Sequence, residues 1–77
     1  MHELGLAHAI VELCAERCDG GRVVRVVVEV GELAAALPDA LRFSFDVASE
    51  GTPVEGATLD IIATPGAELR VRRMEVV

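Results

Sequence analysis

The chain has 77 residues, the length of one small domain, and 13 acidic against 7 basic residues give it a formal charge of −6. This balance argues against a nucleic-acid-binding protein, because such proteins draw much of their affinity from basic patches. Hydrophobic residues make up 52% of the chain, but no apolar run approaches the roughly 20 residues of a membrane-spanning helix. No basic stretch precedes an apolar one at the start, so no secretory signal is predicted and we expect a cytoplasmic protein.

Residues 4–18 are predicted to form a helix, because their larger side chains recur at intervals of three and four. The recurring positions are Leu6, Ile10, Leu13, Cys14 and Arg17. Asp19 and two glycines follow and end the helix, since glycine is the usual left-handed stop.

Residues 22–33 give the strongest strand prediction, because β-branched residues dominate them. In strict alternation one face is wholly apolar and the other is mixed, which indicates a sheet covered mainly on one side. The apolar face comprises Val24, Val26, Val28 and Val30; the mixed face comprises Val23, Arg25, Val27 and Glu29.

A second helix is predicted from Pro38, which suits a first helical turn, to about Glu50, with Gly51 as the stop. Leu41, Phe45 and Ala48 form its apolar stripe, and Leu37 extends the stripe. The chain has no Trp or Tyr, so we expect its two phenylalanines, at positions 43 and 45, to supply much of the core volume.

Two further strands are predicted at 57–63 and 67–77, separated by the turn sequence Thr64-Pro65-Gly66. In the last strand the alternation changes phase, which predicts a β-bulge near Arg72 and Arg73. The element order is α-β-α-β-β, so the expected fold is α+β, with two helices packed on one face of a three-stranded mixed sheet. The first two strands should be parallel, because a helix links them, and the last two antiparallel.

Few residues are arranged for enzymatic chemistry. Neither histidine is placed beside a Ser or Thr in the manner of a hydrolytic triad, and Gly20-Gly21 precedes a strand rather than the helix that a phosphate loop requires. His8 has only Glu12 as a ligand partner on its helix face. Cys14 and Cys18 do not form a Cys-x-x-Cys pair, so a zinc site of that type is excluded. We expect no enzyme.

His2 stands where it can chelate a metal. The free α-amine, the amide nitrogen of residue 2 and the imidazole close two fused chelate rings on one ion, and the amide nitrogen or the carboxylate of Glu3 completes the set. A planar nitrogen set favours Ni(II) or Cu(II). The alternative interpretation is an ordinary solvated terminal histidine. The candidate metal ligands are therefore Met1, His2 and Glu3.

Seven segments together resemble the HypA/HybF family of nickel metallochaperones, over nearly the whole chain. They are Met1-His2-Glu3-Leu4, Val26-x-Val28-Glu29-Val30-Gly31-Glu32-Leu33, Pro38-Asp39-Ala40-Leu41-Arg42-Phe43-x-Phe45-Asp46, Glu50-Gly51-Thr52, Gly56-Ala57-x-Leu59, Glu68-Leu69-Arg70-Val71 and Glu75-Val76.

The resemblance implies nickel held by the terminal amine, His2 and nearby backbone nitrogens, with Glu3 close to the metal. It also implies a role in the maturation of [NiFe]-hydrogenase, or of urease, and a hydrogenase-maturation GTPase or the hydrogenase large subunit as partner. Residues 1–77 would be a single nickel-binding domain.

The chain departs from the family pattern at about residues 62–67, where the family carries a zinc module with two Cys-x-x-Cys pairs. We therefore expect no structural zinc. An alternative is an interaction module of the same fold that has lost metal delivery. A free edge on the last strand would allow a homodimer.

Overall fold

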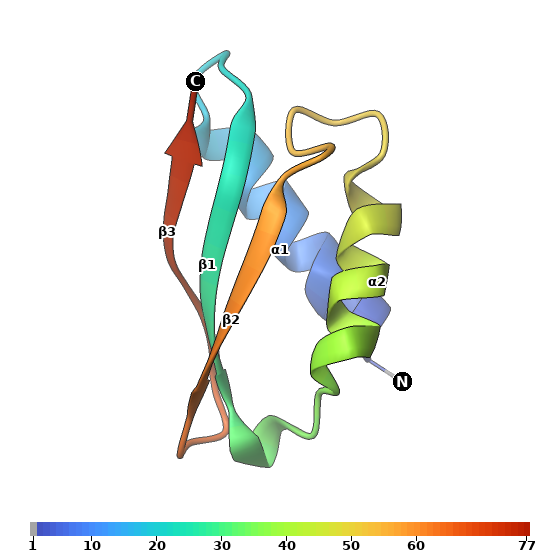
Figure 1. The fold of residues 1–77 in the computed structure, drawn as a ribbon, viewed down its shortest axis with the longest axis vertical. Coiled ribbons are helices and arrows are strands. Elements are labelled where there is room, and N and C mark those ends of the chain that lie inside the picture. The colour runs from blue at the N-terminus through green and yellow to red at the C-terminus, as the bar shows by residue number, and fades with distance from the viewer. Residues whose placement is uncertain (1) are drawn as a thin grey trace.

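A computed structural model describes residues 2–77, which form two helices and three strands (Figure 1). They are, in chain order, α1 (Glu3–Arg17), β1 (Val23–Gly31), α2 (Pro38–Ser49), β2 (Thr58–Thr64) and β3 (Leu69–Val76), with a 3₁₀ turn at Glu32–Ala34. The predicted α-β-α-β-β order is confirmed, and every predicted boundary lies within two residues of the observed one. None of the helices in residues 2–77 is long and apolar enough to cross a membrane.

The three strands form one mixed sheet in the order β2-β1-β3. β1 is parallel to β2 and antiparallel to β3. The last two strands therefore run in opposite directions, as predicted, but β1 lies between them and they do not pair. Residues 65–68, which join β2 to β3, must cross the end of β1. The crossing is held by the Gly31 N–H, which donates to the Glu68 carbonyl over 2.8 Å, and the Leu33 N–H, which donates to the Gly66 carbonyl over 3.0 Å.

Two irregularities interrupt the pairing of β1 with β3. Opposite Val27 and Val28, β3 contains the extra residue Arg72, which confirms the predicted bulge. At a second irregularity, Val24 is an extra residue in β1 without a partner in β3. Strict alternation therefore fails at this end of β1: Val23 is 1% exposed in the core, whereas Val24 is 43% exposed. The prediction that Val24 lies on the core face was wrong.

The core lies between the sheet and the two helices, which cover the same face of the sheet (Figure 1). α1 buries Ala7, Ile10, Val11 and Cys14, and α2 buries Leu41, Phe45 and Ser49. Leu6 and Leu13 are only partly buried, and Arg17 is exposed, so the buried face of α1 is rotated from the predicted stripe.

Two predictions for the core were wrong. Phe45 is fully buried, but Phe43 is 71% exposed and Leu37 is 66% exposed. Side chains two residues apart on an α-helix differ in direction by about 200°, so Phe43 and Phe45 point to opposite sides of α2. Leu37 precedes α2 in an extended conformation and leaves the line of its apolar stripe.

The opposite face of the sheet carries ion pairs between strands. Arg25 on β1 bonds Asp60 on β2 at 2.5 Å and lies 3.6 Å from Glu75 on β3, and Glu29 on β1 bonds Arg70 on β3 at 3.1 Å. Most of these side chains are more than a third exposed, so each pair contributes at most about 1 kcal/mol.

Candidate metal site at the start of α1

Two of the predicted metal ligands, His2 and Glu3, lie at the start of α1. Met1 lies outside the described residues, so the structure adds nothing about it. His2 is the N-cap residue of α1, and its carbonyl accepts the first helical hydrogen bond, from the Leu6 N–H, over 2.9 Å. Its side chain is exposed and makes no capping hydrogen bond. The imidazole of His2 is therefore accessible from solvent.

Glu3 connects the starts of the two helices. Its Oε2 accepts a hydrogen bond from the Leu37 N–H over 3.1 Å, across 34 residues of sequence. Leu37 is the N-cap residue of α2. This hydrogen bond lowers the pKa of the Glu3 carboxyl from its ordinary value, and a hydrogen bond from the backbone of Glu3 itself adds to the effect. The carboxylate is thus ionised near neutral pH, with one oxygen engaged by Leu37.

The backbone nitrogens at residues 2 and 3 lie outside the helical hydrogen-bond ladder. The first N–H groups of an α-helix have no intrahelical acceptor, and here the ladder begins at Leu6. Residues 2–77 contain no group of three or more His, Cys, Asp or Glu side chains arranged to hold a metal ion. The predicted chelate does not require such a group, since most of its donors are main-chain nitrogens.

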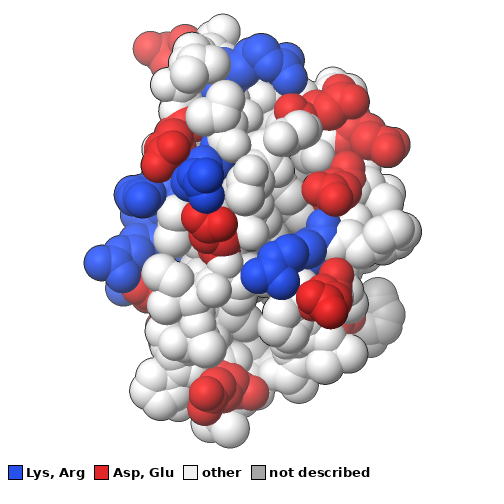
Figure 2. Space-filling model, viewed as in Figure 1, with Lys and Arg blue, Asp and Glu red and all other residues white. Residues whose placement is uncertain are grey.

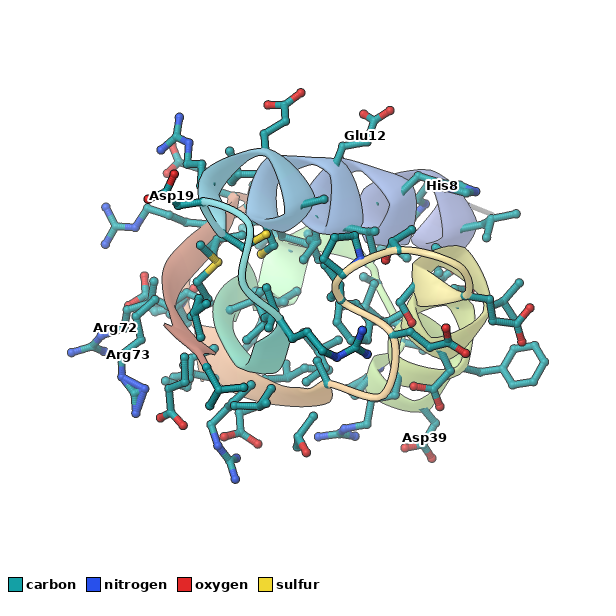
Figure 3. The ribbon with its side chains drawn as sticks, turned by 90° about the horizontal axis from the view of Figure 1, so that it is seen from above. His8, Glu12, Asp19, Asp39, Arg72 and Arg73 are labelled. Atoms are coloured by element: carbon teal, nitrogen blue, oxygen red, sulfur yellow. The ribbon has the colours of Figure 1, made fainter. Side chains whose placement is uncertain are left out.

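His8 and Glu12 project from the outer face of α1, away from the core (Figure 3). They lie one helical turn apart on the exposed surface, and no interaction between them is present among the described hydrogen bonds and ion pairs. Their arrangement is that of a solvated helix face. It adds no further ligands to the start of α1.

Cys14 and Cys18 are both reduced and buried. Cys14 lies on the core side of α1, and Cys18 follows its last residue. Burial raises the pKa of the Cys14 thiol, and the neighbouring Cys18 adds to the effect. The Cys18 thiol donates to the Ala15 carbonyl over 3.3 Å. Buried protonated thiols are poor metal ligands, because binding requires the thiolate.

Sequence reasoning missed two features near this site. One is the Glu3–Leu37 hydrogen bond, which joins positions that no local pattern relates. The other is an apolar pocket of about 210 Å³ between the ends of β1 and β2 and the start of α2. Val30, Ala36, Pro38, Leu41 and Ile61 are among its lining residues.

Comparison with known proteins identifies the fold and the family. The solution structure of the Ni metallochaperone HypA from Helicobacter pylori superimposes with a TM-score of 0.84, covering 100% of this chain and 98% of that one. A second structure, described as the solution structure of HypA protein, gives a TM-score of 0.78. Sequence identities of 21% and 22% mean that these likenesses establish the fold alone.

Curated relatives are closer in sequence. The hydrogenase maturation factor HypA of Nostoc punctiforme is 48% identical over 66 residues, and that of Trichodesmium erythraeum is 50% identical over 66 residues. In both cases the match covers 86% of this chain but only 58% of the relative.

The family model for hydrogenase/urease nickel incorporation, metallochaperone, HypA, matches residues 1–72. This family is one of metallochaperones, in agreement with the expectation that the chain is not an enzyme. The chain belongs to the HypA family.

Proposed function

We propose that the chain binds Ni(II) through Met1, His2 and Glu3 and acts as a nickel metallochaperone in hydrogenase or urease maturation. The observation that carries the proposal is the exposed imidazole of His2 at the start of α1, beside backbone nitrogens that the helix does not use. Family membership supports nickel as the cargo. The curated relatives are named hydrogenase maturation factors, which supports that pathway.

Each residue has a distinct role in this proposal. Met1 supplies the α-amine, His2 supplies its amide nitrogen and imidazole, and Glu3 supplies its amide nitrogen. The Glu3 carboxylate, bonded to Leu37 through Oε2, holds the first residue of α1 against the start of α2. In this proposal it is the alternative donor to the Glu3 amide nitrogen. Imidazole and deprotonated amide ligands in a plane suit Ni(II).

The proposed partners are a hydrogenase-maturation GTPase or the hydrogenase large subunit, in the cytoplasm.

We propose no structural zinc for this chain. A tetrahedral structural zinc site needs four ligands, usually thiolates and imidazoles. Here both thiols are buried in and just after α1, and the four residues that join β2 to β3 contain no Cys.

Isothermal titration calorimetry with Ni(II), on protein whose N-terminus is Met1, tests the proposal. Substitution His2→Ala removes the imidazole and one chelate ring, so Kd should rise by at least about tenfold, equivalent to about 1.4 kcal/mol. One residue added before Met1 moves the amine out of the chelate and should weaken binding to a similar extent. Binding should also weaken below neutral pH, because protons must leave the amine, imidazole and amides.

His8→Ala is the matched control, because His8 is also an exposed histidine on α1. It should leave the nickel isotherm unchanged. An unaltered isotherm for His2→Ala would contradict the proposal. If the unmodified chain takes up no nickel yet captures the purified hydrogenase-maturation GTPase, the interaction module without metal delivery is the correct description.

A further inference from the structure

A groove runs between α1 and the outer edge of β3, far along α1 from Glu3. It consists of two adjoining hollows of about 200 and 180 Å³ that share Leu13 and Val71. The first is apolar and is lined by Ala9, Ile10 and Leu69 in addition to the shared pair. The second continues along β3 to Met74 and is bordered by Arg17, Arg72 and Arg73. We call the whole feature the α1–β3 groove.

The backbone along one side of this groove is a free strand edge. β3 has eight residues and pairs only with β1, so its other edge has no strand beside it within residues 2–77. A free edge presents N–H and C=O groups at the spacing that an added strand requires. The α1–β3 groove therefore combines a backbone template with an apolar floor, the two elements of recognition by strand addition.

One end of the groove is bordered by arginines although the whole chain is acidic. β3 carries Arg70, Arg72 and Arg73, and basic side chains gather along the β3 side of the molecule (Figure 2). Figure 3 shows Arg72 and Arg73 pointing outward from this edge. Each has one weak partner, Glu29 or Glu75, at 3.4 Å, and Arg17 makes no ion pair among the described residues. Positive charge is thus concentrated at one end of the groove.

We propose that the α1–β3 groove binds an extended acidic segment of a partner protein, which adds as a strand to β3. Alternate side chains of such a segment would point toward the apolar floor formed with Leu13 and Val71. Its carboxylates would meet Arg72 and Arg73. A second copy of this chain is a poorer occupant, because a two-fold pairing of β3 with itself would bring the arginines of both copies together.

The bulge at Arg72 and the arginines restrict which strand can add to β3. Bulges and charged side chains on an edge strand oppose pairing with other strands. The charges on this edge are positive, so only an acidic strand gains from them, and it must pair with the regular stretch of β3 on one side of the bulge. The proposal does not depend on nickel.

The test uses the full chain without nickel, and two-dimensional NMR records the amide signals of the chain. The probe is a short blocked peptide in which Glu and Val alternate. Its addition should shift the amide signals of residues 9–17 and 69–76 saturably. Raising the ionic strength from about 0.01 M to about 0.15 M shortens the Debye length from about 30 Å to about 8 Å and should weaken binding.

Two variants of the chain complete the design, together with two altered peptides, one with methylated backbone nitrogens and one with Lys in place of Glu. Arg72→Ala with Arg73→Ala should weaken binding by about tenfold. Both side chains are exposed, so the fold should persist, which the NMR spectrum verifies directly. Arg42→Ala, an exposed arginine on α2, is the matched control and should have no effect. A probe with methylated backbone nitrogens should not bind, since it cannot form the strand pairing.

Three results would overturn the proposal. The first is no shift in residues 69–76 at peptide concentrations that saturate weak complexes. The second is equal binding of the methylated probe, or of one with Lys in place of Glu. The third is a dimer in sedimentation that the double variant dissociates, which would assign the groove to a second copy.

Discussion

Phe43 and Phe45 lie two positions apart on α2, and their surroundings are opposite. Phe45 is fully enclosed by α1, α2 and the sheet, whereas Phe43 lies on the outer surface of α2. Composition suggested that both would fill the core, because they are the only aromatic residues. Helical geometry allows only one of them to do so.

Substitution Phe45→Ala should therefore lower the free energy of unfolding by about 3–5 kcal/mol, through lost burial and the cavity left behind. Phe43→Ala should change it by less than about 0.5 kcal/mol. Urea denaturation followed by circular dichroism measures both. Similar losses for the two variants would show that the exposed face of α2 packs against something in solution.

Glu3 illustrates a residue whose neighbour cannot be read from sequence. Its hydrogen bond to the Leu37 N–H crosses 34 positions and depends on how α1 and α2 meet. The position of His2 at a helix start, by contrast, followed directly from the pattern of residues 4–18. The place of His2 before the first helix could thus be predicted from the sequence, and the hydrogen bond between Glu3 and Leu37 could not.

At the scale of elements, β1 is the centre of the fold because both other strands pair with it. Its run of valines made the strand predictable, and the phase change in β3 predicted the bulge at Arg72. The irregularity at Val24 left no mark in the sequence, because its neighbour Val23 is also a valine and either could continue the apolar face. Where neighbouring residues are identical, alternation cannot reveal a shift in register.

Gly31 permits the β2–β3 connection to cross the end of β1. A Cβ added there would overlap the carbonyl group of Gly66, which is backbone and cannot rotate away. Gly31→Ala should lower the free energy of unfolding by about 1–3 kcal/mol, by analogy with overpacked cores. Thermal unfolding followed by circular dichroism is the measurement.

Gly5→Ala is the matched control for that substitution. Gly5 lies within α1, where an added Cβ meets nothing within 4 Å. Gly5→Ala should raise the free energy of unfolding by about 0.5–1 kcal/mol, because alanine is the better helix former. An equal effect of the two substitutions would mean that the crossing is looser than the structure indicates.

At the scale of the whole molecule, the two cysteines report on cooperative unfolding. Cys14 and Cys18 are buried, and the raised pKa of Cys14 keeps its thiol protonated near neutral pH. Thiol reagents attack the thiolate, so labelling of the native protein should be slow. In increasing urea, labelling should follow the loss of helical circular dichroism signal, because exposing the thiols requires α1 to leave the sheet.

Rapid labelling without urea, at the rate of a short cysteine peptide, would contradict this expectation. It would mean that α1 separates from the sheet while the rest of the molecule stays folded. Mass spectrometry of the labelled protein distinguishes modification of one cysteine from modification of both. A comparison at two pH values separates the effect of burial from that of thiolate concentration.

The sequence alone determined the class of fold and the order of elements, and it suggested Met1, His2 and Glu3 as candidate metal ligands. These follow from local rules: the periodicity of apolar residues, the conformations of glycine and proline, and the chemistry of one imidazole near a chain end. The family resemblance drawn from seven segments was likewise a property of the linear chain, and the family comparison confirmed it.

Only the tertiary structure decided what depends on distant segments. It placed β1 between β2 and β3, put Phe43 and Leu37 in solvent, joined Glu3 to Leu37 and set Arg17 beside the arginines of β3. These relations arise from packing several elements around one core, where residues tens of positions apart compete for the same space. Local patterns hold no record of that competition, because each describes a single helix or strand.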